Sequence, residues 1–89
     1  MKLQKAGAGA VIITLDKEFS ISSEKEIADL IGSLPSGEVQ NILLDFNPVE
    51  IFDNTGLNLL LKLHVRSRKL RRNLIAVGVI DRFLDIFKL

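Results

Sequence analysis

The alternation of short apolar runs with amphipathic segments constrains the fold of this 89-residue chain more than any other feature of its sequence. Short apolar runs that are bounded by turn residues are typical of strands buried inside a sheet. Three such runs occur, namely AVIITL at 10–15, VQNILLDF at 39–46 and LIAVGV at 74–79. Met1–Lys5 alternates apolar and polar residues, and Gly7 and Gly9 follow it. This pattern predicts an edge strand that forms a hairpin with the first buried strand.

The first amphipathic segment is predicted to be a helix from Ser23 to Leu34. Ser23 and Glu26 have the spacing of a capping box, in which each side chain accepts a hydrogen bond from the other residue's backbone N–H. Apolar residues then recur at helical spacing, at Ile27, Leu30, Ile31 and Leu34. Pro35 and Gly37 follow and indicate where the helix ends.

The second amphipathic segment begins at Leu57 and has an unusually wide apolar arc. Its apolar face consists of Leu57, Leu60, Leu61 and His64, with Leu59, Leu63 and Leu70 beside it. The opposite face carries a polar stripe made of Asn58, Lys62, Arg66 and Lys69. The segment ends in the basic run HVRSRKLRR, which is predicted to be a solvated helix end where cations offset the helix dipole.

A third helix is predicted after residue 80. Phe83, Leu84 and Phe87 are expected to face the sheet, whereas Ile86 and Leu89 point elsewhere and would be covered by self-association or by a partner. Strands and helices in this order predict an α/β fold, in which helices cover a mixed sheet of about four strands. The chain is long enough for one domain and too short for two.

Composition excludes several classes of function. The chain has no cysteine, which removes disulfides, thiol nucleophiles and cysteine metal sites. Its one histidine, His64, is expected to be a buried or boundary residue rather than a ligand or base. The formal net charge is +1 and the basic run has no interleaved aromatic residues, so nucleic-acid binding is not expected. No apolar run approaches the about 20 residues of a membrane span, so direct membrane insertion is not expected either.

One polar stretch interrupts the pattern between the second buried strand and the second helix. Asp53, Asn54, Thr55 and Gly56 stand in a row between apolar residues. Asn54 and Thr55 are good helix caps, and capping alone would explain such residues at a helix start. The same residues would also suit a docking surface or a phosphoacceptor site, because free amides and the helix dipole at a helix N-terminus tolerate a phosphate. The residue types alone leave both explanations open.

The order of these features favours the second explanation, because LLDF, a turn, IFDNTGLNLLLKLHVRSRKL and NLIAVGV resemble the STAS domain family. This family includes the bacterial anti-sigma factor antagonists. Its members follow a strand that ends in an acidic residue with an aspartate, serine, serine or threonine, glycine motif at the start of a leucine-rich helix. By this resemblance Asp53 takes the acidic position, Thr55 the hydroxyl that partner kinases phosphorylate, and Gly56 the motif glycine, while Asn54 departs from the pattern.

The resemblance implies that residues 1–89 form a single STAS-like domain, shorter at the C-terminus than most members, that acts as a cytoplasmic bacterial binding module. Its protein partner would be an anti-sigma factor or an ATP-binding kinase, with phosphorylation of Thr55 as a switch. The predicted contact residues are Asp53, Asn54, Thr55, Gly56, Asn58 and Lys62. The alternative is a small subunit of a transport assembly, partnered with a transporter ATPase or related to anion transporters, and a homodimer or a scaffold role also stays open. With no paired nucleophile and base, phosphate loop or metal-ligand set, no enzymatic activity, cofactor or metal is predicted.

Overall fold

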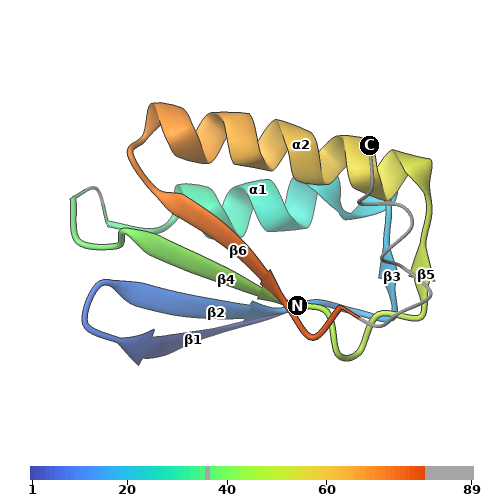
Figure 1. Cartoon of the computed structure of the whole chain (residues 1–89), viewed down its shortest axis with the longest axis horizontal. Coiled ribbons are helices and arrows are strands. Elements are labelled where there is room, and N and C mark those ends of the chain that lie inside the picture. Colours follow the sequence, from blue (N-terminus) through green and yellow to red (C-terminus); the bar gives the residue numbers. More distant parts are fainter. Residues whose placement is uncertain (36, 80–89) are drawn as a thin grey trace.

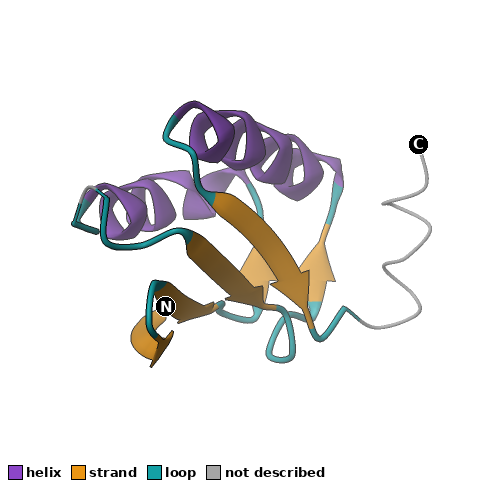
Figure 2. Ribbon diagram, turned by 60° about the vertical axis from the view of Figure 1, so that its left-hand side comes forward, coloured by secondary structure: helices purple, strands orange, loops and turns teal. Residues whose placement is uncertain are grey.

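The computed structural model describes residues 1–35 and 37–79, in which helices cover one face of a four-stranded sheet (Figures 1 and 2). A second, two-stranded sheet lies at one end. The elements are β1 (Lys2–Gly7), β2 (Ala10–Thr14), β3 (Glu18–Phe19), the 3₁₀ helix η1 (Ile21–Ser23), α1 (Glu24–Gly32), β4 (Asn41–Asp45), β5 (Ile51–Phe52), α2 (Asn54–Lys69) and β6 (Asn73–Val77).

The larger sheet is mixed and has the strand order β1-β2-β4-β6. β1 forms an antiparallel hairpin with β2, whereas β2, β4 and β6 run parallel to one another. Parallel neighbours require a crossover connection, and α1 and α2 supply the two crossovers. The predicted α/β class, the hairpin and the mixed four-stranded sheet are therefore confirmed.

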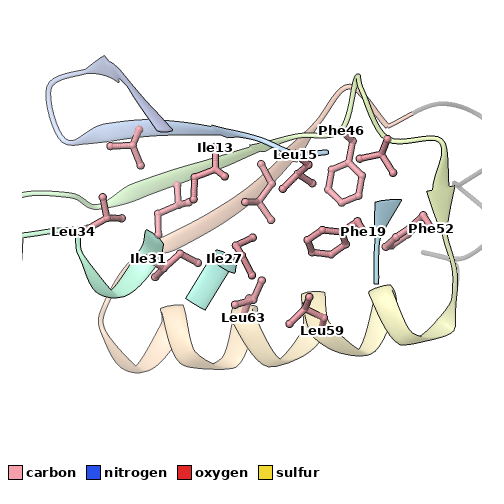
Figure 3. Packing of buried hydrophobic residues seen from close by; sticks show 14 of the residues in the cluster. Ile13, Leu15, Phe19, Ile27, Ile31, Leu34, Phe46, Phe52, Leu59 and Leu63 are labelled. Atoms are coloured by element: carbon pink, nitrogen blue, oxygen red, sulfur yellow. The ribbon is translucent and has the colours of Figure 1, made fainter. Parts of the chain in front are cut away.

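The core lies between the helices and the sheet face that they cover (Figure 3). Successive strand side chains point to opposite faces, so β2 and β4 each contribute alternate residues to this core. α1 and α2 close it from the other side. The most deeply buried aliphatic residues are Ile13, Ile27, Ile42, Leu44 and Leu59. Of the sequence expectations for α1, Ile27, Ile31 and Leu34 are buried and Leu30 is partly buried.

The two-stranded sheet of β3 and β5 was not predicted from the sequence. Each strand has only two residues, too few to show a periodic pattern. What holds them is an aromatic cluster in which the ring centroids of Phe19 and Phe52 lie 5.5 and 5.4 Å from that of Phe46. This cluster lies at one end of the core, next to the beginning of α2 (Figure 3).

The start of α1 differs from the prediction. The capping box is formed by Ser20 and Ser23, and it opens η1 rather than α1. Ser23 already has a helical backbone, and its side chain makes no capping bond to α1; its hydroxyl instead accepts from the Ser20 N–H and donates to the Glu18 carbonyl. The predicted box of Ser23 and Glu26 is therefore wrong, because the chain becomes helical one turn earlier than the pattern indicated.

The buried face of α2 is also different from the predicted one. The residues that point into the core are Gly56, Leu59, Leu63 and Ser67. Leu57 and Leu60 are partly buried, but Leu61 is 44% exposed and His64 is exposed. The predicted apolar face is therefore right only in part, and the expected buried or boundary position of His64 is wrong. The buried face of α2 begins at Gly56 and ends at Ser67. A search for apolar side chains does not find these two small residues.

The basic run at the end of α2 is solvated only in part. Arg66, Arg68, Lys69 and Arg71 are exposed, as predicted. Arg72 is 6% exposed, and its guanidinium donates to three backbone carbonyls at the end of α1. One cation of the run is therefore part of the interior.

The predicted third helix, with Phe83, Leu84, Ile86, Phe87 and Leu89, lies outside the described residues. No described helix covers the second face of the larger sheet (Figures 1 and 2). On that face Ile12, Leu43 and Ile75 are neighbours on three adjacent strands, and Ile75 is 42% exposed.

Candidate functional site

The candidate site lies where β5 leads into α2, next to the aromatic cluster. Asp53 is the N-cap of α2: its backbone is extended, with φ −116° and ψ −171°, and its carboxylate Oδ1 accepts from the Gly56 N–H at 3.1 Å. A carboxylate at this position takes up one of the free amides of the helix and interacts favourably with the helix dipole. The cap is therefore Asp53, whereas Asn54 and Thr55 are the first two residues of the helix.

Thr55 links the beginning of α2 to η1. Its hydroxyl donates to the Asp53 carboxylate at 2.6 Å and accepts from the Ile21 N–H at 3.1 Å. The residue is nevertheless exposed. The hydroxyl that the sequence singles out is thus fixed in position by two partners and belongs to an exposed residue.

These contacts stabilise the charged form of Asp53. The hydrogen bond from the Thr55 hydroxyl, and next the one from the Gly56 amide, lower the pKa of the Asp53 carboxyl below its ordinary value of 3.8. A lowered pKa means that the contribution of this carboxylate to stability is complete above the ordinary value and is lost as the pH falls through the lowered one. Asp53 is therefore ionised wherever the protein would function near neutral pH.

Thr55→Val is expected to move the pKa of Asp53 back towards its ordinary value, because valine has nearly the shape of threonine but cannot donate to the carboxylate. A ¹³C NMR titration of the side-chain carboxyl measures this shift. Asn54→Ala is the matched control, since it changes the neighbouring residue and leaves both bonds to the carboxylate in place. Equal Asp53 titration curves for Thr55→Val and the parent would contradict the assigned role of the hydroxyl.

Gly56 is buried and packs against the chain's own backbone. A Cβ atom built on it would overlap the carbonyl oxygen of Phe19 and lie 2.9 Å from Cδ1 of Phe52. The absence of a side chain therefore lets the first turn of α2 approach β3 closely. Phe19 and Phe52 of the same domain occupy the space next to Gly56, so no partner can contact it there. Asp53, Asn54 and Thr55, in contrast, are exposed.

A groove of about 990 Å³ extends from Thr55 along α2; we call it the α2 groove. Its apolar lining consists of Ile21, Leu61 and Val65, and its polar lining of Glu24, Thr55, Asn58, Lys62, Arg66 and Lys69. Three of the six predicted contact residues therefore line one groove. Asp53 and Asn54 precede its Thr55 end, and Gly56 lies beneath it in the core.

The family of the chain is shown by a match over nearly all of its sequence. A model of the STAS domain matches residues 3–89. The chain belongs to the STAS domain family. This confirms the family predicted from the second half of the chain, from about Asn41 onward, and extends the match to the first half. STAS domains mediate protein–protein interactions and are generally not catalytic.

Solved structures agree with the assignment to the STAS fold. Murine Slc26a9, a Solute Carrier 26 anion transporter in its inward-facing state, matches with a TM-score of 0.77 and 17% identity over 90% of this chain. The crystal structure of Mglu matches with a TM-score of 0.75 and 15% identity, again over 90%. This STAS domain spans only 13% and 20% of those longer chains, respectively. None of the curated proteins compared with it matches significantly.

Two further observations bear on the class of site. In the described part of the chain, no three histidine, cysteine, aspartate or glutamate side chains gather as the ligands of a metal ion would. No helix in the described part of the chain has both the length and the apolar content that crossing a bilayer requires.

The apolar lining of the α2 groove was missed from the sequence. The sequence pattern predicts Leu61 on the apolar face of the helix and indicates no role for Ile21 or Val65. A usable signal was present, since Leu61 and Val65 are four residues apart and alternate with Lys62 and Arg66 at the same spacing. Residues four apart share a helix face, so the two rows lie side by side on the surface of α2.

Proposed function

We propose that this STAS domain is a non-catalytic, cytoplasmic regulatory module that docks an anti-sigma factor or a regulatory kinase. The docking surface consists of Asp53, Asn54 and Thr55 together with the α2 groove. Thr55 is the phosphoacceptor that controls the docking. The bond network at Thr55 carries this proposal, because it holds an exposed hydroxyl in a defined position at the open end of a groove.

The geometry supports a switch that acts on the domain as well as on its partner. Transfer of a phosphoryl group from ATP to Thr55 Oγ1 forms an O–P bond and breaks the bond between the γ-phosphorus and the bridging oxygen of ATP. ADP is released, and the hydroxyl proton passes to solvent. The modified oxygen can no longer donate to Asp53, whose carboxylate lies at 2.6 Å. A group with a charge of about −1.5 to −2 then stands beside a carboxylate at the docking surface.

One helix amide is not available to relieve this repulsion. The sequence suggested that free amides would hold a phosphate on Thr55, but the Gly56 N–H is already bonded to Asp53. Phosphorylation is therefore expected to displace Thr55 from Asp53 and from the Ile21 N–H. Because Ile21 lines the α2 groove, the modification would change both the charge and the shape of the docking surface.

Thr55→Glu is expected to weaken binding of the partner at least tenfold, which corresponds to about 1.4 kcal/mol. The partner is first isolated with the unmodified domain as bait, and its dissociation constants from the two proteins are then measured by calorimetry. Gln40→Glu is the control for charge, since Gln40 is exposed and lies beside Gly9, at the far end of the sheet from Thr55. It should bind like the parent.

Equal binding by Thr55→Glu and the parent would remove the switch from this proposal. A constitutive interface, as in a subunit of a transport assembly, would then explain the groove better. A phosphorylation assay with the isolated partner and ATP gives a second measurement, because modification at Thr55 should disappear in Thr55→Val.

A further inference from the structure

We infer that the α2 groove binds an amphipathic helix of the partner whose polar side is acidic. This inference rests on the proposed docking function and specifies the chemistry of the partner. It is carried by three properties of the groove, namely its exposed apolar floor, its excess of cations over carboxylates among the described lining residues, and its length.

The floor of the groove is apolar and open. Ile21, Leu61 and Val65 are 54%, 44% and 53% exposed. Scattered apolar residues on a surface need no explanation, but these three line one groove. Covering them would remove apolar area from water, which is the usual driving force of association. The occupant must therefore present an apolar surface of its own.

The cations beside this floor set the charge of the occupant. Lys62, Arg66 and Lys69 lie along one side of α2 at helical spacing. Lys62 pairs with Glu24 at 3.3 Å, whereas Arg66 and Lys69 form no ion pair with any described residue. Glu24 thus offsets one of three cations. An occupant with carboxylates beside its apolar surface would complement the remaining charge, and a basic one would be repelled.

The shape of the groove favours a helix over an extended strand. From Thr55 to Lys69 the lining follows α2 through 14 residue steps, about 21 Å. The walls are side chains of a helix whose backbone amides and carbonyls are already bonded internally, so a strand would find no edge with which to pair. An amphipathic helix of about four turns matches both this length and the apolar floor.

An acidic occupant also explains the sign of the switch. Thr55 lies at one end of the groove, so a phosphate there adds negative charge to a surface that selects negative partners. Phosphorylation would then weaken docking. A basic occupant would be held more tightly after phosphorylation, which gives the two alternatives opposite expected results.

Two synthetic 14-residue peptides test the inference. Both carry leucine at positions 1, 4, 5, 8, 11 and 12; one has glutamate at the flanking positions and the other has lysine there. Fluorescence anisotropy with the complete chain should show saturable binding of the acidic peptide and at least tenfold weaker binding of the basic one. The double variant Arg66→Glu/Lys69→Glu should reverse this preference.

Matched variants separate the groove from the rest of the surface. Val65→Ser should weaken binding of the acidic peptide at least tenfold. Ile75→Ser, at an exposed apolar residue on β6, should leave that binding unchanged. Arg68→Glu adds the same charge change to an exposed residue of α2 outside the groove and should have a smaller effect than Arg66→Glu. Circular dichroism verifies that each variant is folded.

Several results would overturn the inference. They are no saturable binding of the acidic peptide below about 1 mM, equal binding of both peptides, or an unchanged preference in the double variant. Binding to phosphatidylglycerol vesicles that depends on Arg66 and Lys69, without peptide binding, would assign the groove to an anionic membrane. Self-association by light scattering that Val65→Ser abolishes would assign it to a second copy of the chain.

These outcomes are distinct from failure of the proposed switch. If Thr55→Glu binds the partner normally while the double variant exchanges peptide preference, the acidic occupant stands and the phosphorylation switch does not. If Thr55→Glu loses the partner while neither peptide distinguishes the double variant from the parent, the switch stands and the acidic helix is wrong.

Discussion

Gly56→Ala is expected to destabilise the domain by about 3 kcal/mol or more, although it adds only one methyl group to a helix. The new Cβ would overlap the Phe19 carbonyl, a backbone atom that no side-chain rotation can move away. The first turn of α2 must therefore shift from β3, and the aromatic contact between Phe19 and Phe52 shifts with it. For a domain of this size the melting temperature should fall by about 12 °C or more.

Gly32→Ala is the matched control for this change. Gly32 is also helical, at the end of α1, but a Cβ there meets no other atom within 4 Å. The same substitution should therefore be neutral or stabilise by up to about 1 kcal/mol, because alanine has the higher helix propensity. Thermal melts of both variants give the comparison. Similar melting temperatures for the two would mean that α2 moves away at little cost, contrary to the packing described above.

The outcome separates two roles for the glycine of the motif. If Gly56→Ala unfolds the domain, its effect on partner binding says nothing about a direct contact, and the contact residues are those that remain exposed. If instead the variant is as stable as the parent and loses only the partner, Gly56 belongs to the interface. The buried position of Gly56 supports the first result.

The sheet could be predicted from the sequence because its signals are local. Apolar runs such as AVIITL contain enough residues to show that they are strands, and the alternation with helices requires parallel pairing. β3 and β5 have two residues each, and their pairing depends on a distant aromatic contact. No local pattern could have indicated them.

The buried face of α2 could not be predicted from hydrophobicity, because the close approach of other parts of the chain decides which of its residues are buried. Gly56 is in the core because the backbone of β3 comes close to it, and Ser67 is 2% exposed at the other end of the same stripe. Leucines occupy most directions around this helix, so they do not identify one face. The leucine pattern therefore predicts Leu61 on the apolar face towards the core, whereas the structure shows that it lines the α2 groove.

The position of the candidate site was predictable, but its bond pattern was not. A run of polar residues before a leucine-rich helix indicated the loop. The sequence could not show which residue caps the helix, because aspartate, asparagine and threonine all suit that position. The Ile21 N–H that bonds Thr55 comes from a segment 34 residues earlier in the chain. Contacts of this kind follow only from the tertiary fold.

Two polar contacts hold the helical layer at opposite ends of the α2 groove. α1 and α2 run in the same direction over the sheet (Figure 1). At their N-terminal ends Thr55 bonds the backbone of η1, which leads into α1. At their C-terminal ends Arg72 bonds the Ile31 carbonyl in the last turn of α1 and two carbonyls just beyond it. Between these contacts the helices pack through apolar side chains, and the exposed ion pair of Lys62 with Glu24 also joins them. A change at either end would therefore alter how the walls of the groove are held.

Arg72→Met is expected to destabilise the domain by about 2–3 kcal/mol, because it removes the hydrogen bonds and the positive charge of the guanidinium but keeps most of the side chain's apolar length. The lost donors leave the carbonyls of Ile31, Leu34 and Pro35 without the bonds of 3.2–3.5 Å that Arg72 gives them. Arg72→Lys should lose less, since an ammonium keeps the charge but cannot bond three carbonyls in the same fork geometry. Arg68→Met is the control at an exposed cation of the same basic run, where a change within about 0.5 kcal/mol is expected. Urea unfolding of the three variants ranks them, and the order Arg72→Met, Arg72→Lys, Arg68→Met from least to most stable is the expected result. Equal stability of Arg72→Met and Arg68→Met would show that the buried guanidinium contributes only packing, and the link between the ends of the two helices would then be apolar.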